Sequence, residues 1–205
     1  DLQVKEFSDY VQPNIAVEDK QLDVNFFQHQ PYLDSFNKDR KTSLVIVPNG
    51  KVHVEPFGAY SSKIKNVKDL KDGASIAIPN DPSNGGRALI LLAKQGLIEL
   101  KDPKSLTPTP LDITKNPKKL KFKELEAPLL PRALADVDLA LINTNYAIEA
   151  KLNPTKDALF IEGSDSPYTN IVAARGDRAN GADIAKLMNA LHTPEVKKFI
   201  QDKYK

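Results

Sequence analysis

The sequence of 205 residues contains no cysteine. This absence excludes a disulfide scaffold, an iron–sulfur centre, a thiol nucleophile and a zinc site with cysteine ligands. Long hydrophobic runs are also missing, since the longest purely apolar segment, Ala88–Ala93, has six residues. A helix needs about 20 apolar residues to cross a bilayer, so the sequence predicts no membrane-spanning helix.

An excess of charge of one sign is missing as well. Lysine and arginine total 29 and aspartate and glutamate total 27, which argues against a nucleic-acid partner. The G-x-S-x-G, P-loop, dinucleotide-binding and H-E-x-x-H motifs do not occur, and the three histidines are scattered. The sequence therefore favours a protein that is not an enzyme and has no metal or cofactor. A transferase-like α/β enzyme is the disfavoured alternative.

Short apolar runs alternate with helical patterns, which predicts an α/β fold. The predicted strands are Leu2–Phe7, Leu22–Phe27, Leu44–Val47, Ser75–Ile78, Leu139–Ile142, Leu159–Ile161 and Tyr168–Ala174. A helix over Arg87–Gln95 ends at Gly96. Near the end of the chain, the apolar stripe around Met188 predicts a core helix. Thr193-Pro194 opens a second helix, which should turn Val196, Phe199 and Ile200 inward.

Two extended segments suggest how the chain divides into domains. Residues 51–65 and 163–175 contain Pro or Gly bends and flank a self-contained block with a βαβ-like pattern. This arrangement predicts a discontinuous first lobe, residues 1–63 with 165–205, and an inserted second lobe, residues 66–162. Within these two segments, residues around 58–65 and 163–170 would act as hinges.

Aromatic and polar side chains gather where a predicted strand turns into a helix, in Phe26–Tyr32. Open α/β sheets bind ligands at the carboxyl ends of their strands. A Gly-rich turn, Pro79–Arg87, follows another predicted strand and leads into a helix, whose N-terminus favours an anion. Arg87 adds a two-pronged donor suited to a carboxylate. Together with amides in Asn143–Asn145 and Ser166–Asn170, these groups predict a site for an amino acid with an apolar side chain.

At these residues the chain resembles the methionine-binding lipoprotein family of the MetQ/NlpA type, the substrate-binding components of methionine ABC importers. The resemblance covers essentially the whole chain. It is carried by Asp9–Asn14 (DYVQPN), Asn25–Phe36 (NFFQHQPYLDSF), Pro79–Leu89 (PNDPSNGGRAL), Leu125–Ala135 (LEAPLLPRALA), Ile142–Ala147 (INTNYA) and Asp165–Asn170 (DSPYTN). It implies a two-lobed, periplasmic-binding-protein-like fold of type II, with methionine bound in the cleft between the lobes.

The same resemblance implies a role for individual residues. Aromatic side chains would surround the thioether group: Tyr10, Phe27, His29 and Tyr32. Arg87 would bind the carboxylate, and two amides, Asn143 and Asn170, would hold the polar end of the ligand. Sulfur packs favourably against aromatic edges, and a buried zwitterion must be fully paired.

Delivery to an ABC importer permease and its ATPase, and a lipid anchor on the outer side of the cell membrane, also follow from the resemblance. Members of the family begin with a further strand and helix after a lipid-bearing cysteine. The chain starts at Asp1 without such a leader, so about 30 or more residues are expected upstream. L-Methionine, D-methionine, a methionine-containing dipeptide and another small apolar amino acid remain alternatives, as does a host-facing role at the cell surface.

Overall fold

A computed structural model describes residues 2–163 and 165–204. The chain divides into two compact units. Unit 1 comprises Asp1–Val54 with Pro167–Lys203, and unit 2 comprises Glu55–Ser166 with Tyr204–Lys205. Within the described residues, no helix has the length and apolar character needed to cross a membrane.

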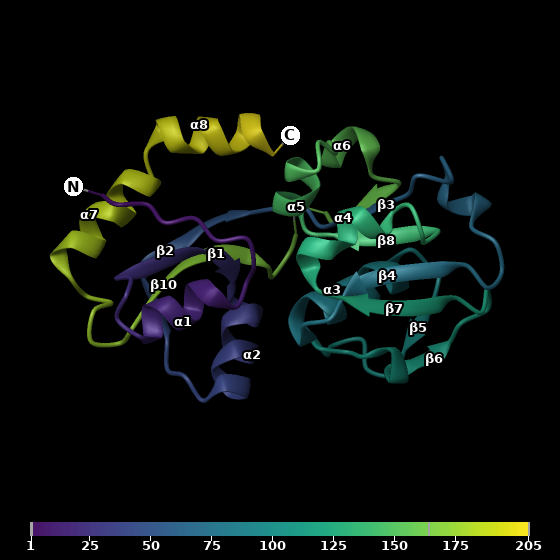
Figure 1. The fold of residues 1–205 in the computed structure, drawn as a ribbon, viewed down its shortest axis with the longest axis horizontal. Helices are drawn as coiled ribbons and strands as arrows, with labels where there is room; N and C mark the ends of the chain where they lie inside the picture. The colour runs from purple at the N-terminus through teal and green to yellow at the C-terminus, as the bar shows by residue number, and fades with distance from the viewer. Residues whose placement is uncertain (1, 164, 205) are drawn as a thin grey trace. The chain divides into compact units, whose positions relative to one another are not determined.

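Unit 1 is built on a three-stranded antiparallel sheet (Figure 1). Its strands, in spatial order, are β1 (Val24–His29), β10 (Thr169–Ala174) and β2 (Val45–Val54). Its helices are α1 (Gln12–Glu18), α2 (Gln30–Arg40), α7 (Ala182–Leu191) and α8 (Pro194–Lys203). The central strand, β10, therefore comes from a part of the chain remote from both of its neighbours.

The central strand of unit 1 is covered on both faces. Because side chains alternate along a strand, Ile171 and Ala173 point to one face and Val172 and Ala174 to the other. The first pair packs with Val17, Leu33 and Leu44, and the second with Val47, Ile184 and Met188. The prediction that Met188 belongs to a core helix is thus confirmed.

Two expectations about unit 1 are wrong. Residues 2–7 form no strand, and Leu2 and Val4 are exposed, so alternation alone does not make a strand without a neighbour to pair with. Helix α8 forms where it is predicted but contains no buried residue. Its Phe199 is 63% exposed, because an apolar stripe is buried only where a packing surface faces it.

Unit 2 contains a five-stranded mixed sheet in the order β7-β4-β8-β3-β9. The strands are β3 (Gly58–Tyr60), β4 (Ser75–Pro79), β7 (Lys121–Leu125), β8 (Leu139–Ile142) and β9 (Phe160–Ile161). Strand β4 is parallel to both β7 and β8, whereas β3 is antiparallel to β8 and β9. A separate pair, β5 (Glu99–Leu100) and β6 (Ile113–Lys115), is antiparallel.

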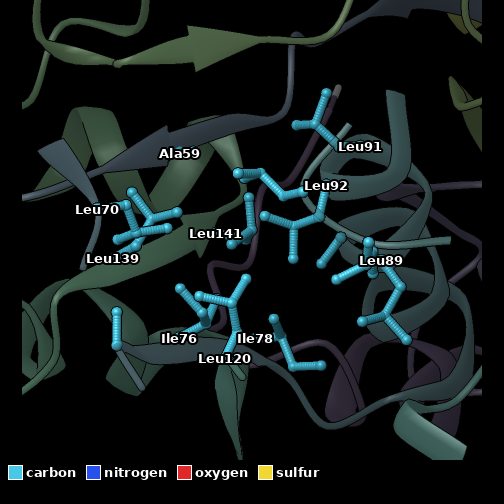
Figure 2. Close-up of a cluster of buried hydrophobic side chains, with 14 of the residues drawn as sticks. Ala59, Leu70, Ile76, Ile78, Leu89, Leu91, Leu92, Leu120, Leu139 and Leu141 are labelled. Atoms are coloured by element: carbon cyan, nitrogen blue, oxygen red, sulfur yellow. The ribbon is translucent and has the colours of Figure 1, made fainter. Parts of the chain in front are cut away.

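The helices of unit 2 are α3 (Pro82–Lys94), α4 (Leu130–Ala133), α5 (Thr144–Glu149) and α6 (Pro154–Asp157), with short 3-10 helices at Val67–Asp69, Pro110–Asp112 and Ala127–Leu129. Helix α3 supplies much of the core of this unit (Figure 2). Its Leu89 and Leu92 pack in one cluster with Ile76, Ile78 and Leu141 of the neighbouring strands. Apart from the segment at residues 2–7, each of the predicted strands overlaps an observed one.

Candidate functional site

The four aromatic residues predicted to bind a ligand side chain lie together in unit 1. The rings of Tyr10, Phe27 and Tyr32 have centroids 5.8–5.9 Å apart, two of the three pairs edge to face. His29 lies 6.4 Å from the Tyr32 ring. The Tyr32 hydroxyl donates a hydrogen bond of 2.8 Å to the backbone carbonyl of Tyr10, which fixes the loop before α1 against α2. These four residues are called the aromatic cluster below.

A β-bulge places Phe27 in this cluster. Phe26 pairs with Val172 and Gln28 pairs with Ile171, so Phe27 is an extra residue in β1. A bulge bends the strand and changes the direction of its side chains. Phe27 consequently packs against Tyr10, while Phe26 lies against the ring of His53 instead.

His29 joins the aromatic cluster to Asn170. His29 is the N-cap residue of α2, and its Nδ1 accepts a hydrogen bond of 3.2 Å from the Tyr32 backbone N–H. The neutral ring therefore carries its proton on Nε2. His29 is paired with Asn170 across the sheet, and its ring lies 5.0 Å from that of Tyr168. All five residues predicted for the first lobe are thus neighbours in unit 1.

A buried network of amides supports β1 next to the cluster. The side chains of Asn14, Asn25 and Gln28 exchange four hydrogen bonds of 2.7–3.0 Å, and Asn25 also donates to the carbonyl of Pro13. Buried polar groups that are fully paired hold a single arrangement of the backbone. The network connects α1 to the bulged strand and so orients Phe27.

Arg87 lies in unit 2, on α3, and is almost completely buried. Its Nε donates a hydrogen bond of 2.8 Å to Glu162, and its Nη2 donates to the second oxygen of the same carboxylate. Nη2 also donates to the backbone carbonyl of Glu55 at 2.9 Å, and the guanidinium lies 5.0 Å from the centre of the Phe57 ring. The side chain is therefore held rigidly by an acid, a carbonyl and an aromatic face.

Asn143 lies in the same unit, directly after β8 at the N-cap of α5. Its Nδ2 donates a hydrogen bond of 2.9 Å to the Oδ1 of Asn84, which is three residues before Arg87 on α3. The Oδ1 of Asn143 is buried and has no hydrogen-bond partner among the described residues. Arg87 and Asn143 are thus linked through one residue of α3, and we call Arg87, Asn84 and Asn143 the polar group of unit 2.

The N-terminus of α3 does not offer the free anion site that the Gly-rich turn predicts. Asp81 is its N-cap residue, and the carboxylate accepts a hydrogen bond of 2.9 Å from the Asn84 N–H. The two glycines serve close packing, because a Cβ on Gly85 would lie 2.8 Å from the Pro79 carbonyl, and one on Gly86 only 2.6 Å from that of Leu106. The negative charge at the N-terminus of α3 is therefore supplied by the carboxylate of Asp81.

Sequence reasoning missed several residues that shape these two groups. Glu162 and Phe57 hold Arg87 but carry no local motif, since Glu162 is 75 residues from its partner. Asp81 and Asn84 belong to the Gly-rich segment that was singled out for its glycines and Arg87. No cluster of three or more histidines and acids among the described residues is arranged to hold a metal ion.

Comparison with known proteins identifies the family. The model of the NlpA lipoprotein family matches residues 1–205. A probable D-methionine-binding lipoprotein MetQ from Pasteurella multocida is 50% identical over 196 residues, which cover 96% of this chain and 70% of that protein. The structure of an ABC transporter periplasmic substrate-binding protein from Coxiella burnetii is similar with a TM-score of 0.94, at 49% identity over 98% of this chain and 84% of the other.

A nutrient-binding protein from Burkholderia cenocepacia, in a structure bound to methionine, also has a TM-score of 0.94. It is 51% identical, over 98% of this chain and 84% of that one. These similarities confirm the predicted α/β fold of the periplasmic-binding-protein type. The family model covers the full sequence, and the Pasteurella multocida relative is 50% identical over the aligned residues, so the chain belongs to the NlpA lipoprotein family.

Proposed function

We propose that the chain binds methionine and delivers it to an ATP-binding cassette importer. The observation that carries the proposal is the presence of two complementary groups of residues in a chain 51% identical to a protein whose structure is bound to methionine. One group is aromatic. The other combines a buried arginine with a buried amide oxygen that has no hydrogen-bond partner among the described residues. A thioether side chain fits the first, and a carboxylate and an ammonium fit the second.

The chemistry of the aromatic cluster suits the thioether side chain of methionine, and the chemistry of the polar group of unit 2 suits its carboxylate and ammonium groups. Thioether sulfur interacts favourably with the edges of aromatic rings, and the aromatic cluster offers several edges. Arg87 is planar and always charged, which suits a carboxylate, while the Asn143 oxygen accepts from an ammonium. Asn170, beside His29 in the sheet, is proposed to bind the polar end as well.

The proposal also covers the two lobes, the location of the protein and its transport partner. We propose that residues 1–63 with 165–205 and residues 66–162 act as two ligand-binding lobes. We also propose that the mature protein is lipid-anchored outside the cytoplasm and that a permease with its ATPase is the partner. The naming of relatives as lipoproteins and as a periplasmic ABC-transporter component supports this setting and a non-catalytic role.

Titration calorimetry on ligand-stripped protein tests the function. L-Methionine, D-methionine, a methionine-containing dipeptide and leucine are compared, and methionine or its dipeptide should bind most tightly. Arg87→Ala should weaken binding by roughly thirty-fold to several thousand-fold, equivalent to about 2–5 kcal/mol for an unpaired buried charge. Arg87→Lys keeps a cation beside Glu162 but lacks the planar group with five N–H donors, so it cannot bind Glu162 and the ligand carboxylate in the same way and should recover only part of the affinity.

The matched control is Arg132→Ala, because Arg132 is exposed on α4. It should bind methionine as the parent does. A folded parent that binds none of the methionine ligands contradicts the proposed function. An Arg87→Ala variant that binds as well as the parent contradicts the carboxylate assignment.

A further inference from the structure

The orientation of the Asn143 side chain is unusual for its position. An asparagine at an N-cap normally accepts a hydrogen bond from the first turn of the helix, but Asn143 makes no such bond. Its Nδ2 instead donates to Asn84, and its Oδ1, in a residue only 7% exposed, has no partner among the described residues. A buried acceptor left unpaired is costly, so this oxygen is suited to accept a hydrogen bond from a bound ligand.

This orientation is determined by Asn84 and, one step further, by Asp81. The Nδ2 of Asn84 lies 3.1 and 3.0 Å from the two carboxylate oxygens of Asp81. Turning the Asn84 amide over would place its Oδ1 against those oxygens, so that acceptors would face each other. The Oδ1 of Asn84 must therefore face Asn143, and Asn143 must donate to it through Nδ2. The Oδ1 of Asn143 then points away from Asn84. The carboxylate is itself fixed, because it also accepts from the Asn84 N–H and from the Ser83 hydroxyl, each at 2.9 Å.

We propose that Asp81 and Asn84 are positioning residues that keep the Asn143 oxygen turned toward the ligand, so that Asn143 recognises the α-ammonium group of methionine and rejects a carboxylate. This inference rests on the proposed function. It specifies that Asp81, Asn84 and Asn143 together recognise the ammonium group of the ligand. An ammonium has only donors and a carboxylate only acceptors, so the direction of one amide decides between them. The site should therefore prefer an amino acid to the acid that lacks its amino group.

Calorimetry with two ligands separates this role from a structural one. The probes are L-methionine and 4-(methylthio)butanoate, which is methionine without the amino group. Asn84→Ala frees the Asn143 amide to rotate, so methionine should bind about ten-fold more weakly, equivalent to 1.4 kcal/mol. Binding of the deaminated acid should stay the same or tighten, so the preference for methionine should fall by at least about ten-fold.

Asp81→Ser provides a second variant if Asn84→Ala fails to fold. Serine can still cap α3 but lacks the second oxygen that holds the Asn84 amide, so it should lower the same preference. Asn116→Ala is the control, because both amide atoms of Asn116 bind the backbone of Leu120 in the same unit. This control should leave the preference unchanged.

The outcomes distinguish the two proposals. Equal weakening of both ligands by Asn84→Ala and Asp81→Ser would show a merely structural role and overturn the inference while the proposed function stands. A folded parent that does not bind methionine would overturn both. A loss confined to the ligand that carries the amino group supports the positioning role.

Discussion

The buried ion pair between Arg87 and Glu162 makes a strong prediction about stability. The two side chains are 4% and 8% exposed, so removing the guanidinium leaves a carboxylate buried without its cation. Breaking a buried pair from one side typically costs about 3–5 kcal/mol. Arg87→Ala also removes the donor to the Glu55 carbonyl and the packing on Phe57. We expect Arg87→Ala to lower the free energy of unfolding by about 3–5 kcal/mol.

Urea unfolding followed by circular dichroism measures this loss. With a slope of about 2 kcal/mol per molar urea, the midpoint should fall by roughly 1.5–2.5 M. The double variant Arg87→Met with Glu162→Leu buries no charge and should recover most of the stability. Arg132 is exposed on α4, so Arg132→Ala should change the free energy of unfolding by less than about 0.5 kcal/mol.

Two results would refute this reasoning. One is an Arg87→Ala midpoint within the error of the parent, which would mean that the pair is not buried in solution. The other is a double variant that loses as much as the two single variants together, because a coupled pair cannot be additive. Either result would also change how the Arg87→Ala binding data are interpreted.

Three other substitutions have defined outcomes. Tyr60→Phe should raise the melting temperature, because its buried hydroxyl has no hydrogen-bond partner among the described residues. The Ser75 backbone N–H and hydroxyl hold the pKa of Asp138 below its usual value. Asp138→Ala should therefore cost about 1 kcal/mol at pH 7, and chemical denaturation should show the difference vanishing as the pH falls through that lowered pKa. Phe199→Gln should leave stability within about 0.5 kcal/mol in the same assay, since Phe199 is 63% exposed.

The amino-acid sequence alone determined the elements whose signals are local. Strands β4 and β8 are runs of apolar residues that are buried along almost their whole length, so their composition was sufficient. Helix α3 has an N-cap aspartate, a proline in its first turn and Gly96 after its end. Each of these signals lies next in sequence to the helix end that it determines. Six of the seven candidate site residues were likewise found in motifs at strand ends and turns, whereas Tyr10 came only from the resemblance to the family.

Tertiary structure alone decided what these residues contact. Glu162 reaches Arg87 across 75 residues and Asn84 reaches Asn143 across 59, and no local pattern encodes such pairings. The bulge that turns Phe27 toward Tyr10 depends on the register with β10, which comes from the far end of the chain. The same holds for α8, whose apolar stripe predicted burial but has no buried residue. The periodicity of apolar residues indicates which face of a segment can be buried, but its neighbours in space decide whether that face is buried. The same neighbours decide which hydrogen-bonding atom remains available to a ligand.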